Sequence, residues 1–215
     1  MWVALDGPEH TEAGRIDVAE AAGWGLAISK GLDSPAPKVD PNEDACGVLA
    51  GERVVAVVAD AHWGAASAVE LVRGFGQHGL TPEALDAARE ALDGERSECA
   101  WLAVEVRDRR VRWWSQGDCR LYRTGLGVVN PLLPAYFGAR FGVRGVRQGS
   151  FELAEGERLV LASDGLPECI YGEPTLDPAA VLAEVHGDAV EVARRLTALA
   201  LEHGGEDNIA VVVSP

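Results

Sequence analysis

Residues 54–65 read VVAVVADAHWGA, and this stretch decides the fold. Its first six residues are apolar and rich in valine, which is typical of a buried strand. The strand ends in an acid, Asp60, and a segment with helical spacing of apolar residues begins at residue 65. The stretch therefore predicts a core strand that brings a carboxylate to the turn before a helix.

Seven further runs are rich in valine, isoleucine, leucine or tryptophan and are bounded by glycine, proline, aspartate or asparagine, which predicts strands. Together with the first, which we begin at residue 53, the predicted strands are residues 24–29, 45–50, 53–59, 100–106, 111–115, 120–124, 158–162 and 209–213. The connections at 50–53 and 107–110 are too short for the crossover between parallel neighbours, so they favour antiparallel pairing.

Helical spacing of apolar residues appears in two blocks. The first covers residues 65–75 and 81–92, and the second runs from residue 177 to 204 with a break at Gly187. Because strands and helices are grouped rather than strictly alternating, the chain is predicted to be α+β with antiparallel sheets. Residues 31–41 and 125–149 are rich in proline or glycine and are expected to be mostly loop.

The acidic composition excludes several classes of protein. The 215 residues include 34 Asp and Glu against 19 Lys and Arg, a net charge of −15, yet 47% of them are hydrophobic. That share is ordinary for a globular protein and too high for an acidic disordered chain. Binding to nucleic acid or to an anionic membrane needs a basic patch and is not expected. The length fits a single domain over residues 1–215, with residues 1–20 as a peripheral N-terminal extension.

The cysteines and the start of the chain favour a cytoplasmic protein. The four cysteines form no CxxC pair and have no partner at zinc spacing, so we expect reduced thiols. The first residues lack the basic and apolar segments of a secretory signal. No run of about 18 uncharged apolar residues predicts a membrane-spanning helix.

Acidic side chains stand where predicted strands begin or end. One such residue is an ordinary turn former, because aspartate favours turns over strand interiors. In an antiparallel arrangement, however, the end of one strand lies beside the start of its neighbour, so these acids can gather on one edge. The residues concerned are Asp60 and Asp164 at strand ends, and Glu43, Asp44, Asp118 and Asp207 at strand starts.

Gathered carboxylates point to bound cations. Like charges held together raise one another's pKa unless a cation neutralises them. Carboxylate oxygens are ligands that Mg²⁺ and Mn²⁺ prefer. Two such ions about 3.5–4 Å apart can deprotonate a shared water and stabilise an in-line displacement at phosphorus. The acids therefore suggest a dinuclear metal hydrolase.

Five short blocks together resemble, in order, the signature of the metal-dependent protein phosphatases of the type-2C (PPM) family. The blocks are NEDACGV (42–48), VVADAHWG (57–64), GDCRLYR (117–123), LASDGLPE (161–168) and GGEDNIAVVV (204–213). The chain looks like a short, bacterial-like member. The resemblance implies a four-layer αββα sandwich of two antiparallel sheets flanked by helices. It also implies that water activated by two or three Mg²⁺ or Mn²⁺ ions hydrolyses phosphoserine and phosphothreonine.

The resemblance further implies which residues form the site. Asp60 would bridge two metals and take part in catalysis, and His62 would give a proton to the leaving alkoxide, a role that suits imidazole. Asp44 would stand behind the ligands, and Asn208 would orient the loop beside it. Asp118 and Glu168 would form a looser third-metal site with Asp164. The full set of implied metal-binding residues is Asp60, Ala61 through its backbone carbonyl, Glu43, Asp164, Asp207, Asp118 and Glu168.

The chain departs from the family pattern at four places. Residue 61 is alanine where the family usually has glycine, and Trp63 stands where a small residue is expected, so it could form a wall of the site. No arginine shortly precedes the NED block. The phosphate-binding candidate is therefore Lys38, with Arg15, Arg140 and Arg144 as alternatives. The interval between Asp118 and Asp164 is short for the family, so residues 125–149 are interpreted as a shortened flap beside the active site.

Two other functions stay open at this point. The missing arginine and the short flap are compatible with a catalytically weak regulatory or phosphoprotein-binding module. An open site would also suit a hydrolase of small phosphoesters. The expected partner is a phosphorylated protein in bacterial signalling, with a Ser/Thr kinase acting on it. Residues 156–168, GERLVLASDGLPE, also resemble the bacterial sigma-regulator phosphatases, which makes a sigma-regulator protein a possible target.

Overall fold

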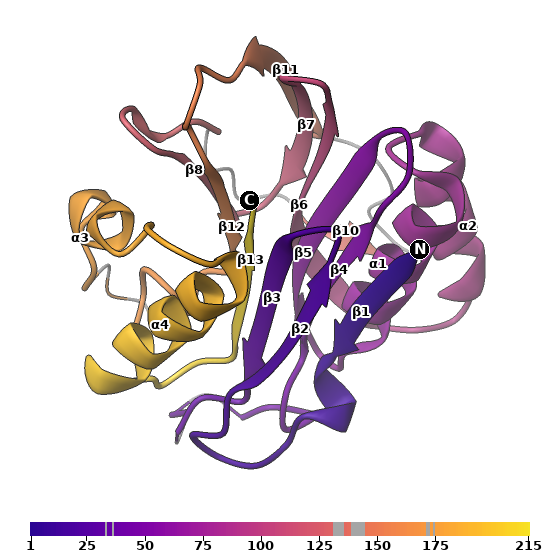
Figure 1. The fold of residues 1–215 in the computed structure, drawn as a ribbon. Helices are drawn as coiled ribbons and strands as arrows, with labels where there is room; N and C mark the ends of the chain where they lie inside the picture. The colour runs from indigo at the N-terminus through magenta and orange to yellow at the C-terminus, as the bar shows by residue number, and fades with distance from the viewer. Residues whose placement is uncertain (33, 36, 131–135, 139–144, 171–172, 174) are drawn as a thin grey trace.

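In the computed structural model, two antiparallel β-sheets lie face to face and helices cover the outer face of each sheet (Figure 1). The structure describes residues 1–32, 34–35, 37–130, 136–138, 145–170, 173 and 175–215. Every strand pair within these residues is antiparallel. The predicted four-layer αββα sandwich is therefore confirmed.

The first sheet has the strand order β1-β4-β5-β6-β7-β11, and β10 also pairs with β6. Helices α1 (Ala66–His78) and α2 (Pro82–Ala91) pack on its outer face, where Phe75 and Leu85 join a buried apolar cluster. The strands are β1 (Trp2–Asp6), β4 (Asp44–Leu49), β5 (Val54–His62), β6 (Glu98–Arg107), β7 (Arg110–Gln116), β10 (Phe137–Gly138) and β11 (Arg147–Glu152).

The second sheet has the strand order β2-β3-β13-β12-β8-β9. Helices α3 (Pro178–Ala183) and α4 (Ala189–Glu202) cover its outer face, and a short 3-10 helix η1 (Gly7–Glu9) follows β1. The strands are β2 (Asp17–Ala21), β3 (Trp24–Ser29), β8 (Arg120–Arg123), β9 (Gly127–Val128), β12 (Leu159–Ala162) and β13 (Ile209–Val213).

The central strand β5 is buried on both of its faces. Ala56 and Val58 belong to the apolar core between the sheets, whereas Val55 and Val57 belong to the core beneath α1 and α2. Strands covered on both sides read as continuous apolar runs, because neither face needs polar residues. Side chains alternate along a strand, so Asp60 continues the series of Ala56 and Val58 and faces the space between the sheets.

All eight predicted strands are present, with ends that differ by up to three residues. The predicted helices are also present, and the break at Gly187 separates α3 from α4. The four cysteines are buried free thiols, as expected. No helix within the described residues is long and apolar enough to cross a membrane.

Residues 1–20, which the sequence suggested as a peripheral extension, take part in both sheets. Strand β1 pairs with β4, and β2 pairs with β3, so this segment adds an outer strand to each sheet. Outer strands have one unpaired edge, and β2 (DVAEA) alternates half-buried and exposed residues over its first four positions. This exposure allows acids and alanines in β2, and because these residues are weak strand formers, the sequence did not predict a strand there.

The expected loop at residues 125–149 contains β9, β10 and the start of β11. Strand β11 reads RQGSFE and is exposed or half-buried throughout because it closes one side of the first sheet, so it lacks an apolar run. Residues 131–135 and 139–144 lie outside the described residues. The candidates Arg140 and Arg144 therefore lie outside the described residues, as does part of the predicted flap.

Helix α4 approaches β3 so closely that only glycine fits at one position. A Cβ at Gly25 would lie 2.2 Å from the backbone oxygen of Ala189, the first residue of α4. Gly25→Ala should therefore lower the free energy of unfolding by about 2 kcal/mol, measured by urea denaturation. The control Gly51→Ala, where the nearest atom is 3.6 Å away, should change it by less than about 0.5 kcal/mol. Equal effects of the two substitutions would contradict this close packing.

Candidate metal centre

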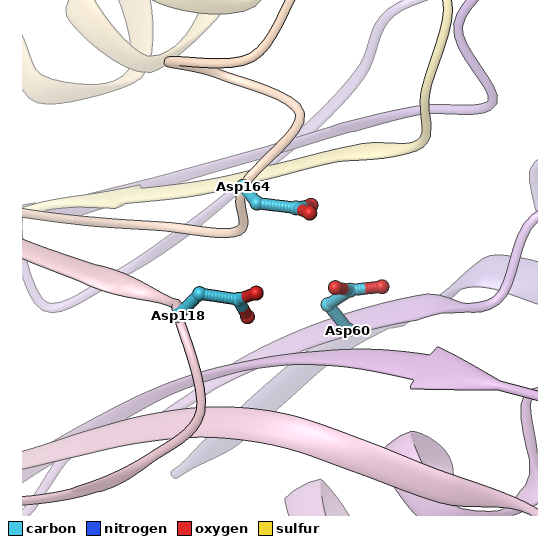
Figure 2. Close-up of side chains that lie close together, drawn as sticks. All are labelled: Asp60, Asp118 and Asp164. Atoms are coloured by element: carbon cyan, nitrogen blue, oxygen red, sulfur yellow. The ribbon is translucent and has the colours of Figure 1, made fainter. Parts of the chain in front are cut away.

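Carboxylates from both sheets meet at one end of the space between the sheets. Asp60 lies near the end of β5, Asp118 precedes β8 and Asp164 follows β12. One oxygen of each lies within 4.8 Å of the others, and Figure 2 shows the three side chains pointing toward one another. The acids at strand ends do gather, as predicted. They gather where two sheets meet, however, and not along the edge of one sheet.

Three buried oxygens at this end have no hydrogen-bond partner among the described residues. They are Oδ1 of Asp44, Oδ2 of Asp60 and Oδ1 of Asp118. Buried polar atoms are normally paired, and an unpaired one costs about 1–3 kcal/mol. A cation would satisfy them, and a set of hard carboxylate oxygens fits Mg²⁺ or Mn²⁺. The residues present therefore fit the metals that the sequence implies.

Burial and mutual repulsion act together on these acids. Burial is the main cause of the raised pKa of Asp60, and the charges of Asp164 and Asp44 raise it further. Burial also raises the pKa of Asp164, with added repulsion from Asp207 and Asp118. The pKa of Asp118 is raised by burial as well. Because the ionised forms are disfavoured, a positive charge is needed to keep the cluster ionised near neutral pH.

Asp44 stands directly behind Asp60. The two are register partners on the paired strands β4 and β5. Oδ2 of Asp44 accepts a 2.7 Å hydrogen bond from the hydroxyl of Ser163, which itself accepts the N–H of Ala210 at 2.9 Å. Asp44 thus connects the first sheet to the segment of the second sheet that carries Asp164.

Glu43 fixes the loops on one side of the site. Its Oε1 accepts the backbone N–H groups of Val39 at 3.1 Å, Asp40 at 3.3 Å and Gly64 at 2.7 Å. Glu43 is only 2% exposed, and it also lines the cavity that opens onto the acids. One carboxylate oxygen therefore holds the loop before β4 against the turn after β5.

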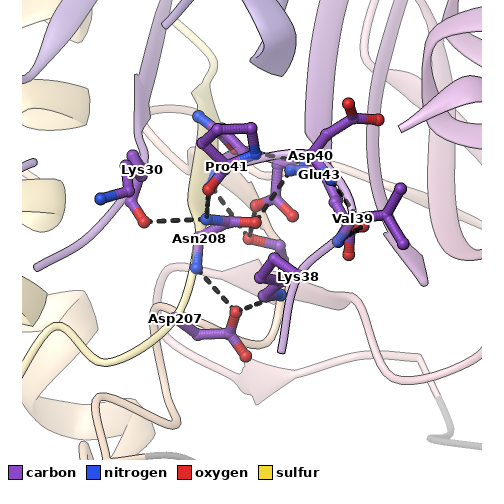
Figure 3. Close-up of polar contacts among 12 residues, drawn as sticks. Lys30, Lys38, Val39, Asp40, Pro41, Glu43, Asp207 and Asn208 are labelled. Carbon is purple, nitrogen blue, oxygen red and sulfur yellow. Dashed lines mark hydrogen bonds and ion pairs between the residues drawn. The ribbon is translucent and has the colours of Figure 1, made fainter. Parts of the chain in front are cut away.

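Asn208 fixes the loops on the other side. Its Oδ1 accepts the N–H of Glu43 at 2.8 Å, and its Nδ2 donates to the carbonyls of Lys30 at 2.8 Å and Pro41 at 3.1 Å (Figure 3). All hydrogen-bonding atoms of this side chain are used between three chain segments. Asn208 therefore sets the position of its neighbour Asp207.

Lys38 reaches the cluster through Asp207. Its Nζ lies 2.7 Å from Oδ1 of Asp207, which also accepts the N–H of Asn208 at 2.7 Å (Figure 3). Burial acts to lower the pKa of Lys38, but the charges of Asp207 and Asp60 outweigh it, so the pKa is raised. Lys38 is therefore a fixed cation at the site, as its candidacy for phosphate binding requires.

A cavity of about 450 Å³ opens onto the acids. Lys38 supplies the one formally positive side chain among the described residues that line it. Glu168, which we predicted at the site, and Glu98, which we did not, also border it. The lining is Pro37, Lys38, Glu43, His62, Trp63, Glu98, Asp118, Tyr136, Asp164, Glu168 and Asp207.

Residues 59–214, well over half of the chain, match the model of the family described as Stage II sporulation protein E (SpoIIE). The chain belongs to the SpoIIE family of PPM-type phosphatases. No curated protein sequence matches it.

Solved structures share the fold of this SpoIIE-family chain. The serine/threonine phosphatase PstP/Ppp of Mycobacterium tuberculosis superposes with a TM-score of 0.68 at 20% identity, over 88% of this chain and 96% of that one. The PstP catalytic domain in complex with two manganese ions gives 0.69 at 20% identity, over 93% and 98%. The PPM Ser-Thr phosphatase MsPP of Mycobacterium smegmatis, in complex with cacodylate, gives 0.65 at 22% identity, over 91% and 98%.

In this SpoIIE-family site, His62 closes β5 and lines the cavity. The ring of Tyr136 meets the imidazole edge to face, with centroids 5.1 Å apart. Glu98 is the register partner of His62 on β6. Neither neighbour was predicted from the sequence. Glu98 could have been found, because it opens a strand as the other acids do, but Tyr136 lies in a segment without a pattern.

Alanine at position 61 needs no unusual backbone. Ala61 is fully buried within β5, and its N–H donates to the carbonyl of Glu43 at 3.3 Å. The positive φ angles fall on the next two turn residues instead, 65° at Trp63 and 106° at Gly64. The departure from glycine at position 61 is therefore compatible with the local structure.

Two other candidates have partners of their own. Glu168 borders the cavity, but its Oε1 lies 3.5 Å from Nη2 of Arg120. Arg15 pairs with Asp17 at 2.9 Å and with Glu12 at 3.3 Å near the start of β2, so the structure does not bring it to the cavity. Among the phosphate-binding candidates that the structure describes, Lys38 is the one at the site.

The raised pKa values predict how the stability of the metal-free protein depends on pH. The raised carboxyls, Asp60, Asp164 and Asp118, keep a proton in the folded state at pH values where the unfolded chain has lost it. The free energy of unfolding then falls as pH rises above about 4, the ordinary carboxyl pKa. With a chelator present, calorimetry should give a higher Tm near pH 5.5 than near pH 8. Asp118→Asn should raise the Tm at pH 8 by about 2–4 °C.

Bound metal should raise the stability of the protein at pH 8. A concentration of Mn²⁺ about 100 times its Kd should stabilise the wild type by about 2.7 kcal/mol. A Tm that neither Mn²⁺ nor Mg²⁺ raises, or a chelated protein that is more stable at pH 8 than at pH 5.5, would contradict a metal-binding cluster.

Proposed function

We propose that this chain is a metal-dependent phosphoprotein phosphatase that hydrolyses phosphoserine and phosphothreonine. The supporting observation is the convergence of Asp60, Asp118 and Asp164 within 4.8 Å in a SpoIIE-family chain, with buried oxygens that lack partners. Mn²⁺ or Mg²⁺ would be held as two ions, with a looser third, by Asp60, Asp164, Asp207, Glu43, the Ala61 carbonyl, Asp118 and Glu168.

When bound, such ions lower the pKa of a water molecule and offset the negative charge of a phosphoryl group. The protein's own part is to hold the carboxylates in place. Asp44 and Ser163 link the two sheets at 2.7 Å, and Asn208 spans three segments beside Asp207. Side chains held on paired strands and by such bonds stay close to one geometry, which catalysis requires.

His62 is the proposed general acid. A leaving serine or threonine alkoxide needs a proton, and an imidazole titrates near neutral pH. The ring borders the cavity beside Asp118 and packs against Tyr136, which restricts its orientation. The proton would pass from this ring to the oxygen that leaves phosphorus.

Lys38 is the proposed phosphate-binding residue. It lines the cavity as a cation, with its side chain 13% exposed and its Nζ paired to Asp207. An ammonium acts as a point charge and lacks the bidentate geometry of the arginine that the family usually has. Binding of the phosphate would therefore depend more on the metals than in relatives with arginine.

The proposed partner is a phosphorylated protein in bacterial signalling. A Ser/Thr kinase would supply the phosphate group, and the block at residues 156–168 makes a sigma-regulator protein one candidate substrate. The prediction of a cytoplasmic location rests on the four free thiols, which suit a reducing compartment.

The central test is metal-dependent turnover. We expect the wild type with Mn²⁺ or Mg²⁺ to hydrolyse both p-nitrophenyl phosphate and a phosphothreonine peptide, and a chelator to abolish both activities. Asp164→Asn removes a charge from the cluster and should lower kcat by about 100-fold or more. The matched control Asp108→Asn, in the exposed β6–β7 turn, should keep wild-type kcat.

Each alternative function has its own result in this experiment. No turnover of either substrate with any metal would favour the phosphoprotein-binding module. Turnover of p-nitrophenyl phosphate without turnover of phosphopeptides would favour a hydrolase of small phosphoesters.

The two substrates also test His62. Nitrophenolate can leave without being protonated, whereas a threonine alkoxide needs a proton to leave. His62→Ala should lower kcat about 100-fold on the phosphothreonine peptide and less than about tenfold on p-nitrophenyl phosphate. His78→Ala, at the exposed end of α1, is the control and should leave both rates unchanged. Equal losses on the two substrates would argue against proton donation by His62.

A further inference from the structure

Two apolar side chains that are open to solvent lie at the cavity or next to its lining: Trp63 lines it, and Val39 directly follows Lys38, which also lines it. Trp63 and Val39 are each 67% exposed, and Trp63 lines the cavity next to His62. They stand on neighbouring segments, since a Cβ at Gly64, the residue after Trp63, would lie 3.7 Å from Cγ1 of Val39. Apolar side chains grouped at the mouth of a binding cavity indicate a contact surface.

The fold does not explain the tryptophan. Trp63 has φ 65°, a left-handed conformation that costs free energy for any residue but glycine and is rare for bulky ones. Glycine would form the same turn without this cost. The side chain packs little, because it is mostly exposed. Such strain is typical of functional sites, where the side chain serves a purpose other than folding.

The segments that carry Trp63 and Val39 are held in a fixed position relative to the acids. Oε1 of Glu43 accepts N–H groups from both Val39 and Gly64, at 3.1 and 2.7 Å. Oδ2 of Asp40 accepts the N–H of Ala65 at 2.8 Å. Two carboxylates therefore tie the segment that carries Val39 to the turn that carries Trp63. A surface that is already ordered loses less entropy when it binds a ligand.

The charges of the cavity oppose acidic neighbours of a phosphate. Besides the acids assigned to metals, the described lining includes the carboxylate of Glu98. A glutamate or aspartate next to the phosphorylated residue would meet like charge there. An apolar residue would avoid this repulsion and could lie against Trp63 and Val39.

We infer that Trp63 and Val39 form an apolar rim that selects phosphorylated protein segments with an apolar residue next to the phosphoserine or phosphothreonine. The inference rests on the proposed phosphatase function and adds the class of substrate sequence. Its physical basis is the area of an aliphatic side chain removed from water against the indole ring.

Three phosphothreonine peptides test the inference. They have alanine elsewhere and leucine, alanine or glutamate on both sides of the phosphothreonine. With the Mn²⁺-loaded full chain, kcat/KM of the wild type should be about five- to tenfold higher for the leucine than for the alanine peptide, and lowest for the glutamate peptide. Trp63→Gly should reduce the leucine-to-alanine ratio to less than about twofold.

Leu126→Gly is the matched control. Leu126 is also 67% exposed, lies in the turn between β8 and β9 and does not line the cavity, so the ratio should stay at its wild-type value. Each ratio compares two peptides on one variant, so a shared loss of metal or phosphate binding cancels. The Tm of Trp63→Gly checks that it is folded, which glycine at this φ favours.

Two results would overturn the inference in different ways. If Trp63→Gly keeps the wild-type ratio while peptides are hydrolysed, the rim does not select substrates and the proposed function stands. If the wild type hydrolyses none of the three peptides, the proposed phosphatase function fails and the inference fails with it.

Discussion

The rest of this structure depends on carboxylates that have left water without gaining enough hydrogen bonds. Burial and repulsion raise the pKa of Asp60 and Asp164, and oxygens of Asp44, Asp60 and Asp118 have no partner in the described part of the chain. Folding would not keep such a cluster unless other contacts fixed it. The double-sided burial of β5, the bond from Ser163 to Asp44 and the three-way bonding of Asn208 supply these contacts. The architecture therefore holds a site that is costly without cations and is completed by them.

Much of this could be predicted because both the core and the site leave local signals. Continuous apolar runs predicted the central strands, because both faces of these strands are buried and need only apolar residues. Acids at the strand ends marked the site, because antiparallel pairing brings such ends together. Asp44 and Asp60 are the clearest case, as register partners on adjacent strands. The order of five motifs then identified the family that the match over residues 59–214 shows.

The features that were missed depend on context that a sequence does not show. Strands β2 and β11 lie at the sides of the sheets, where exposure permits glycine, arginine and acids in place of apolar runs. Tyr136 meets His62 only because β10 returns to β6 at Cys99 and Glu98. The use of Glu43 as an anchor for backbone N–H groups depends on loop geometry, which residue types do not specify. Sequence thus predicted which chemical groups the site contains better than how they are supported.

The net charge of −15 opposes the approach of the anionic phosphate group of a phosphorylated partner. Long-range attraction cannot bring it to the site, and salt screens what attraction the metals and Lys38 provide beyond about 8–10 Å. Contact must therefore gain free energy from interactions that do not depend on net charge. The exposed indole of Trp63 offers such an interaction at the cavity, with the exposed side chain of Val39 on the neighbouring segment. Under the proposed selectivity, the strained Trp63 would let apolar contact choose a partner whose phosphate the acidic surface repels.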